Sequence, residues 1–350
     1  MKRIRYFDHL RAFAILAVVI LHVSGQNFRN IDIHSGDWFA MNIWESMSRW
    51  GVPVFAMISG ALFLSSDYTI ERLLRKNVLR IVIAFFSWST IYLFLTNKTW
   101  NTASVLAQIT SGYFHMWFLY MIAGMYLLVP ILRHMVKNQK ITRYFLLLCF
   151  LFAYALPELV KLIGEYSEMF GSLGRNMLGM LNLNYVMGFT GYFVLGYVLH
   201  QTEIDRQTTR RIYISGAMAF LFTLVGTIII SFHDGAANTL FYENFTVNTL
   251  LESAAIFLLF KNRIGSETTA SASDGSFISD RIILFLSGCS FGIYLIHPAW
   301  IYVLERYFGI TTLSASAWIS VPLLTIVCLL LSLTLTAILR FIPVIKRYLV

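Results

Sequence analysis

Apolar residues occur in long runs along this chain, and the polar residues gather in short stretches between the runs. A helix needs about 20 predominantly apolar residues to cross a bilayer. Runs of this kind cover residues 7–27, 42–64, 78–96, 113–132, 142–163, 182–200, 211–232, 245–260, 282–305 and 313–339. The pattern therefore predicts an all-α, polytopic membrane helix bundle of about ten transmembrane helices, forming a single domain over residues 1–350.

The composition supports the same class of protein. Hydrophobic residues make up 57% of the chain and charged residues 13%. A soluble domain has about 45–50% apolar and about 25% charged residues. Water does not solvate a surface of this composition, so the chain is expected to present its apolar side chains to the lipid bilayer.

The distribution of Lys and Arg predicts the orientation of the helices. Basic residues gather in cytoplasmic loops. If both ends of the chain are cytoplasmic, 20 of the 27 basic residues lie in inner segments. These are Lys2, Arg3, Arg5, Arg72, Arg75, Lys76, Arg80, Arg133, Lys137, Lys140, Arg143, Arg206, Arg210, Arg211, Lys261, Arg263, Arg281, Arg340, Lys346 and Arg347. The net charge of +9 thus reflects membrane topology, and it gives no reason to expect nucleic-acid binding.

Two connecting segments differ from ordinary loops. Residues 265–281 are rich in Ser, Thr and Ala and are expected to form a flexible inner linker. Residues 164–182 combine four glycines with Tyr, Met and Leu, which favours a re-entrant or surface-lying outer segment that roofs a cavity. The three cysteines lie within predicted spans and lack metal-site spacing, so no metal is expected.

Ionisable residues inside the first span form the main candidate site. Arg11 and His22 are eleven positions apart, so they lie on one helix face, offset by about 20° and separated by about 16 Å. Asp8 is one turn before Arg11 and is positioned to pair with it. Ionisable side chains within a span usually face a cavity or a partner. The alternative is an arginine that extends to the interface and a hydrogen-bonded core histidine.

Other polar positions are candidates for the same site. His297 and Arg49 are expected at the depth of His22, in the outer third of the bilayer, although for His297 alone a structural role is slightly favoured over a catalytic one. His115 and Trp117 belong to an aromatic stretch that also fits an interfacial belt. Ser59 lies in a small-residue segment that also fits close helix packing. Arg72, Arg75 and Lys76 share a helical face, which suits either polyphosphate binding or a topology signal.

Four short motifs together resemble the membrane acyltransferase-3 family over nearly the whole chain. They are Arg11-x10-His22 preceded by Asp8, Pro-Val-Phe-x-x-x-Ser-Gly at 53–60, His-x-Trp-Phe at 115–118, and Ser-x-x-x-Tyr-Leu-x-His at 290–297, which includes Tyr294. Within the family, the chain looks most similar to the enterobacterial-common-antigen O-acetyltransferase group. The basic Arg-x-x-Arg-Arg motif of the family reads Arg72-x-x-Arg75-Lys76 here, and the lysine loses the bidentate fork of arginine.

The resemblance implies a multi-pass enzyme of a bacterial inner or plasma membrane that transfers an acyl group, usually acetyl. The donor would be cytoplasmic acetyl-CoA, a substrate and no bound cofactor. The acceptor would be a hydroxyl of an extracytoplasmic glycan or lipid-linked sugar, and partner proteins of envelope biosynthesis are conceivable. His22, Arg11 and Asp8 would be catalytic. Arg72, Arg75, Lys76 and Ser59 would bind the donor, and His115, Trp117, Arg49, Tyr294 and His297 would lie on the acceptor side.

Two other functions fit the same residues. A transporter or flippase for a glycan or small metabolite would line its path with them but consume no thioester. A non-catalytic subunit of an envelope complex would need His22 for packing alone. For the enzyme, His22 would act either as a general base or as a nucleophile that carries the acyl group.

Overall fold

The computed structural model describes residues 3–96, 100–181, 183–265 and 274–350, and this part of the chain contains helices and no β-strand. The predicted all-α fold is therefore confirmed. The helices are α1 (Arg5–Ser24), α2 (Gly36–Ser48), α3 (Gly51–Leu64), α4 (Ile70–Arg72), η1 (Leu73–Val78), α5 (Leu79–Thr96), α6 (Thr102–Ser111), α7 (Trp117–Met135), α8 (Gln139–Cys149), η2 (Phe150–Ala155), α9 (Leu156–Tyr166), α10 (Glu168–Met180), α11 (Asn184–Gln201), α12 (Arg206–Asp234), η3 (Leu240–Tyr242), α13 (Val247–Ile264), α14 (Asp274–Phe308), α15 (Ala317–Leu339) and α16 (Pro343–Tyr348).

Within the described residues, eight segments are long and apolar enough to cross a membrane. They are Arg5–Ser24, Gly36–Leu64, Ile70–Thr96, Trp117–Met135, Gln139–Tyr166, Arg206–Asp234, Asp280–Phe308 and Ala317–Leu339. The predicted spans at 182–200 and 245–260 coincide with α11 and α13, which fall outside this set. The chain is thus a multi-pass membrane protein, while the count of ten and the cytoplasmic ends stay predictions.

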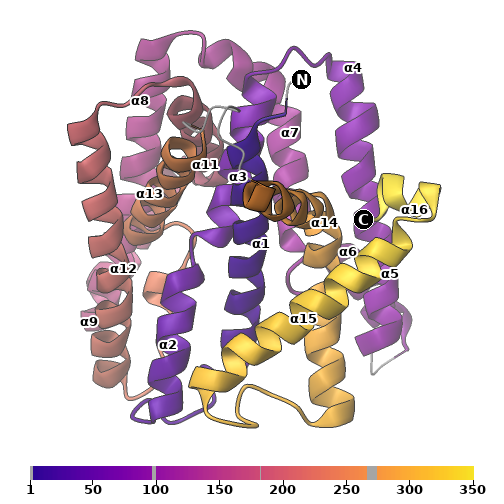
Figure 1. Cartoon of the computed structure of the whole chain (residues 1–350). Helices are drawn as coiled ribbons and strands as arrows, with labels where there is room; N and C mark the ends of the chain where they lie inside the picture. Colours follow the sequence, from indigo (N-terminus) through magenta and orange to yellow (C-terminus); the bar gives the residue numbers. More distant parts are fainter. Residues whose placement is uncertain (1–2, 97–99, 182, 266–273) are drawn as a thin grey trace.

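Helix α1 lies at the centre of the bundle, and it contacts α2, α3, α13, α14 and α15. In Figure 1 it runs down the middle of the molecule, with the N-terminus and the α3–α4 connection at one end. The loops that join α1 to α2 and α14 to α15 lie at the opposite end. Leu10, Ala14 and Ile15 are completely buried, as expected for a helix surrounded on most of its circumference. The candidate residues of α1 are therefore enclosed by protein.

The predicted span 42–64 is two helices, because the chain bends between Ser48 and Gly51. Pro53 lies in the first turn of α3, where its missing N–H leaves no helical hydrogen bond unmade. Arg49 occupies the end of α2 at this bend.

The structure gives more detail on two connecting segments. Residues 164–181 are helical for most of their length, since α10 folds back along α9 and the two helices meet at Gly164 and Gly171. Neither cavity described below includes residues of this segment, so the roofing role is not supported. Of the predicted linker 265–281, residues 266–273 lie outside the described residues, and the chain is helical from Asp274 onward.

Helices α3 and α11 make the closest packing contact in the part of the protein that the structure describes. A Cβ built on Gly60 would lie 1.8 Å from the carbonyl oxygen of Phe193, and one on Gly196 would lie 2.1 Å from that of Met57. Backbone atoms within a helix cannot move aside as a flexible side chain can. Small residues at such crossings allow helices in a bilayer to approach closely. The glycine of the 53–60 motif thus has a packing role.

We expect Gly60→Ala to destabilise the fold, because the added methyl group overlaps a backbone carbonyl. Overpacking of this kind costs about 1–3 kcal/mol or more. The matched control is Gly124→Ala in α7, where an added Cβ meets no atom within 4 Å. Thermal unfolding in detergent should show a clearly lower midpoint for the first variant and an unchanged or higher one for the second. Equal midpoints would contradict the packing role.

The two ends of α12 test the orientation. Glu203 precedes this helix on the side predicted to be cytoplasmic, and Ala236 follows it on the other side; both are exposed. In intact cells, Ala236→Cys should react with a membrane-impermeant thiol reagent, whereas Glu203→Cys should react only with a permeant one. The reverse pattern of labelling would place both ends of the chain outside the cytoplasm.

Candidate functional site

A cavity of about 1030 Å³ opens at the end of the bundle that holds the N-terminus. Its mouth is lined by Arg72, Arg75 and Lys76 from the segment that joins α3 to α5, and Arg80 from the first turn of α5 also lines the cavity. Arg11 and Ser59 lie farther in, and the deep part is lined by Val18, Val52, Phe55, Phe118, Ile122 and Tyr294. We call this the inner cavity. Its volume matches the upper end of the range for small-molecule and cofactor sites, about 300–1,000 Å³.

Local structure brings the basic residues to the mouth of the inner cavity. Thr69 caps α4 by accepting a hydrogen bond from the backbone N–H of Arg72. The chain then passes through η1, a π-helical segment that carries Arg75 and Lys76. Such wide turns within α-helices occur frequently at functional sites. Arg133 of α7 donates hydrogen bonds to the carbonyl oxygens of Phe63 and Tyr68, which fixes the start of this segment.

A second cavity, of about 640 Å³, opens at the other end of α1. His22 and Arg49 line it together with polar and aromatic residues, which include Gln26, Arg29, Glu45, Tyr113, Phe114, Tyr242, Tyr302 and Glu305. We call this the outer cavity. The structure thus places His22 and Arg49 in one cavity, as expected from their depth. It places Arg11, Ser59 and the basic triplet in the other.

The two cavities approach each other along one face of α1. The inner cavity reaches Val18, and the outer cavity begins at Leu21 and His22. This separation is three or four residues of helix, or about 5 Å. Val18 follows Arg11 by seven residues, so both lie on the face that carries His22. One helical turn therefore divides a cationic cavity from a histidine-lined one.

His22 and His297 form a hydrogen-bonded pair at this division. Nδ1 of His22 lies 2.7 Å from Nε2 of His297, and the rings are stacked with centroids 5.0 Å apart. Nδ1 of His297 lies 2.9 Å from the carbonyl oxygen of Ile293, which only accepts hydrogen bonds, so Nδ1 carries the proton. In the neutral pair, Nε2 of His297 accepts and Nδ1 of His22 donates. Nε2 of His22 consequently keeps its lone pair.

His115 completes a cluster of three histidines. Its ring lies 5.8 Å from that of His297 and 6.5 Å from that of His22, and it is almost fully buried. Neither ring nitrogen has a hydrogen-bond partner among the described residues. Tyr294 donates its hydroxyl hydrogen to the backbone carbonyl of His115. No group of three or more His, Cys, Asp or Glu side chains is arranged as a metal site in the ranges that the structure describes.

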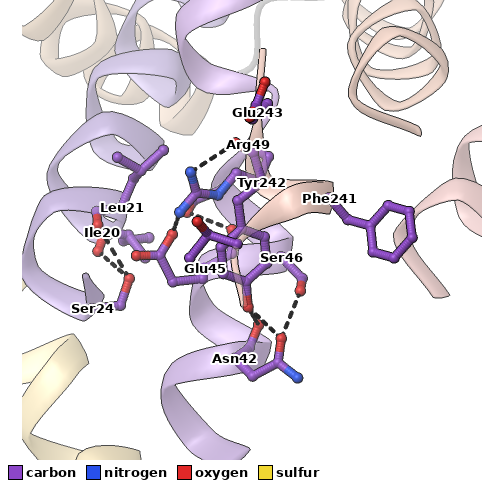
Figure 2. A network of polar contacts seen from close by, with 12 residues as sticks. Ile20, Leu21, Ser24, Asn42, Glu45, Ser46, Arg49, Phe241, Tyr242 and Glu243 are labelled. Carbon is purple, nitrogen blue, oxygen red and sulfur yellow. Dashed lines mark hydrogen bonds and ion pairs between the residues drawn. The ribbon is translucent and has the colours of Figure 1, made fainter. Parts of the chain in front are cut away.

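Arg49 belongs to a buried polar network between α1, α2 and η3, shown in Figure 2. It forms an ion pair with Glu45, one turn earlier, and donates to the carbonyl oxygen of Tyr242 at 2.9 Å. Its guanidinium also lies 4.2 Å from the centre of the Tyr242 ring. A Cβ on Gly25 would lie 2.6 Å from the Glu45 carboxylate, so glycine at this position lets the carboxylate approach α1 three residues after His22. The charge of Arg49 is thus compensated.

Several predicted site residues lie elsewhere than expected. His115 and His297 are buried beside His22 but line neither cavity. Asp8 accepts hydrogen bonds from Arg3 and Ser287, both at 2.7 Å, and does not pair with Arg11. It lies fourteen residues before His22, or about 21 Å along α1, which is too far for a direct role at that histidine.

Trp117 packs against the ring of Phe189 and lines neither cavity, whereas its neighbours Phe114 and Phe118 do. Tyr294 lines the inner cavity and not the outer one. Both departures have one cause: a position in the sequence gives the depth of a residue better than the direction of its side chain.

Sequence reasoning missed several residues of both cavities. Glu45 carried a usable signal, because a carboxylate inside a predicted span requires a partner and Arg49 follows it by one helical turn. Arg347 and Tyr348 of α16 line the inner cavity, although Arg347 looked like a topology signal only. Their place beside Arg72 and Arg75 depends on contacts between distant parts of the chain, and no local pattern reveals it.

Comparison with known proteins decides the class of protein. A family model described as an acyltransferase domain, Acyl_transf_3, matches residues 4–338. The chain belongs to the acyltransferase-3 family. It is therefore a membrane acyltransferase, and the family assignment favours the enzyme over the transporter. No curated protein and no solved structure matched the chain in the two other comparisons.

Proposed function

We propose that this acyltransferase-3 protein is an O-acetyltransferase. It would take an acetyl group from cytoplasmic acetyl-CoA and transfer it to a hydroxyl of a glycan or lipid-linked sugar outside the cytoplasm. The observation that carries the proposal is the pair of cavities that meet within one turn of α1. The motif resemblance to the enterobacterial-common-antigen O-acetyltransferase group supports acetyl as the acyl group and a bacterial inner membrane as the location.

The inner cavity suits the donor. Coenzyme A carries a pyrophosphate and a 3′-phosphate, and arginine binds phosphates through bidentate hydrogen bonds. Arg72, Arg75 and Lys76 at the mouth would hold these phosphates. The apolar deep part, which ends at Val18, would hold the pantetheine arm and bring the thioester to the level of His22. Charged CoA need not cross the membrane in this arrangement.

The outer cavity suits the acceptor. Glu45 and Glu305 supply carboxylates that accept hydrogen bonds from hydroxyl groups, and Tyr113, Phe114 and Tyr302 supply aromatic faces. A sugar hydroxyl beside Nε2 of His22 would lose its proton to that nitrogen. The acceptor oxygen attacks the thioester carbonyl, the C–S bond breaks, and the departing CoA thiolate takes up the proton as the thiol.

His297 orients the base in this scheme. Its hydrogen bond keeps the proton of His22 on Nδ1, so the lone pair stays on Nε2. When Nε2 gains a proton, the contact with Nε2 of His297 stabilises the cation. In the alternative route, Nε2 of His22 would act as a nucleophile. It would receive the acetyl group from the thioester and then pass it to the hydroxyl.

Two measurements test the function. Purified protein in nanodiscs, given acetyl-CoA and an extract of envelope glycolipids, should release free CoA thiol. Mass spectrometry of envelope glycans from cells with and without the protein should show a species heavier by one acetyl group in the first. A protein that moves glycolipid across the bilayer without consuming the thioester would contradict the proposal and favour a flippase.

A further inference from the structure

Helix α16 forms part of the wall of the inner cavity. Arg347 and Tyr348 line the cavity together with Arg72, Arg75 and Lys76, from which they are separated by more than 250 residues of sequence. Arg347 is exposed to solvent, as are the three basic residues of the α4–η1 segment, so these side chains lie at the mouth. Val18 and Phe118 lie at the deep end.

The segment that carries these two side chains is fixed to α5. The indole N–H of Trp88 donates to the carbonyl oxygen of Leu349, and Nη2 of Arg80 donates to that of Val350, both at 3.0 Å. Val350 is 4% exposed and belongs to the main hydrophobic core. Arg347 and Tyr348 are therefore held against the cavity by the residues that follow them. Figure 1 shows α16 beside α5.

The charges at this mouth are strongly unbalanced. Six cationic side chains line the inner cavity, namely Arg11, Arg72, Arg75, Lys76, Arg80 and Arg347, against one carboxylate, Glu71. Glu71 is paired with Arg75 at 3.3 Å. A cavity lined mainly by one sign of charge attracts ligands of the opposite charge, and this one matches a ligand that carries several phosphates.

An aromatic ring accompanies the cations. The guanidinium of Arg347 lies 5.1 Å from the centre of the Tyr348 ring. A phenol ring beside an arginine can bind a nucleotide, because a base stacks on an aromatic ring while the cation contacts a phosphate. The apolar part of the cavity lacks such cations, so it suits the end of the donor that carries the acyl group.

We propose that α16 binds the phosphoadenosine end of the acyl-CoA donor, with Arg347 on a phosphate and Tyr348 against the adenine. This inference rests on the proposed function, because it assumes that the donor is a CoA thioester. It assigns the nucleotide to a segment that the acyltransferase motifs do not include. The thioester would then lie at the far end, which Val18 and Tyr294 line.

The test is an equilibrium binding assay on the full-length protein in detergent. Labelled CoA is displaced by unlabelled CoA or by adenosine 3′,5′-bisphosphate, which is the nucleotide half alone. Arg347→Gln should weaken both ligands about tenfold, since hydrogen bonds to charged groups are among the strong ones. Tyr348→Ala should weaken both by about fivefold or more, and Tyr348→Phe should restore binding because the ring is kept.

Lys346→Gln is the matched control. Lys346 is an exposed cation of the same short helix, next to Arg347, but it does not line the cavity. Its loss removes the same charge and should leave both affinities within about twofold of wild type. Each variant should elute from gel filtration as a single symmetrical peak, which verifies that the substitution has not disturbed the fold.

Each result has one meaning. Wild-type protein that binds no CoA overturns the proposed function itself. Wild-type protein that binds CoA while Arg347→Gln and Tyr348→Ala bind it equally well overturns the role of α16 alone. The role of α16 is also overturned if the wild type does not bind the bisphosphate, or if the variants lose affinity for CoA but not for the bisphosphate. It is likewise overturned if Lys346→Gln lowers the affinities as much as Arg347→Gln does.

Discussion

Replacing His22 with alanine should abolish acyl transfer while the protein still folds and inserts. A positioned general base contributes about 10²–10⁴-fold to the rate. Nε2 of His22 is the nitrogen with a free lone pair in the His22–His297 pair, and the ring lines the outer cavity. Removal of a ring from a cavity wall leaves space that solvent can fill. We therefore expect at least a hundredfold loss of CoA-thiol release, with normal expression in membranes.

Two histidine variants give this prediction its controls. His297→Ala should have a milder effect than His22→Ala, because it removes the group that orients the base and leaves the base present. His34→Ala should have no effect, since this exposed residue packs on Phe232 and lines neither cavity. Turnover of His22→Ala within a few-fold of wild type would make His22 a structural residue and shift attention to His115 and His297.

Acetylation of the wild-type protein in the absence of acceptor separates the two chemical routes. Wild-type protein incubated with acetyl-CoA and no acceptor should carry an acetyl group on His22 if the relay operates, and peptide mass spectrometry would locate it. A protein that stays unmodified under these conditions and still acetylates the added acceptor would use His22 as a base. In both cases His22→Ala is inactive.

Replacing Arg11 with glutamine should lower kcat and raise KM for acetyl-CoA together. Arg11 lines the inner cavity beyond its mouth, about 16 Å below His22 along α1. The carboxylate of Asp8 is held by Arg3 and Ser287, and Arg11 lines the cavity, so its guanidinium is positioned to act on the donor. A hydrogen bond to a charged group contributes about 1.5–3 kcal/mol. The expected loss in kcat/KM is therefore about tenfold or more.

The structure gives a reason why this variant should fold. Asp8 was expected to lose its partner with Arg11, but it is held by Arg3 and Ser287 instead. No buried carboxylate is thus left unpaired. Tryptophan fluorescence and thermal unfolding of Arg11→Gln should match those of the wild type. A marked loss of stability would show that the cation acts mainly within the fold.

Arg75→Gln is the comparison for Arg11→Gln. Arg75 is exposed at the mouth and paired with Glu71, so it should affect KM by a few-fold and leave kcat nearly unchanged. This effect should shrink as salt is added, because exposed charges are screened over about 10 Å at 0.1 M. A wild-type KM for Arg75→Gln and Lys76→Gln at low salt would reduce the basic segment to a topology signal.

The sequence by itself determined the features that depend on local geometry. The length of the apolar runs predicted where long helices occur along the chain, since a helix needs a certain number of apolar residues to cross a bilayer. The spacing of Arg11 and His22 fixed their common face, because the α-helix turns by the same angle at every residue. Arg72, Arg75 and Lys76 line one cavity as a group, although Arg75 and Lys76 lie in the π-helical η1, where the α-helical spacing does not apply.

Only the tertiary structure decided which distant side chains meet. His22 and His297 are 275 residues apart, and their hydrogen bond exists because α1 and α14 pack together. Asp8 is held by Arg3 and by Ser287 of α14, and no local pattern predicts the second of these contacts. Trp117 points away from the cavities although Phe118 points into one. The contribution of α16 depends on hydrogen bonds from Trp88 and Arg80. Helix periodicity is a property of neighbouring residues, whereas the direction of a side chain across an interface is set by the packing of the whole bundle.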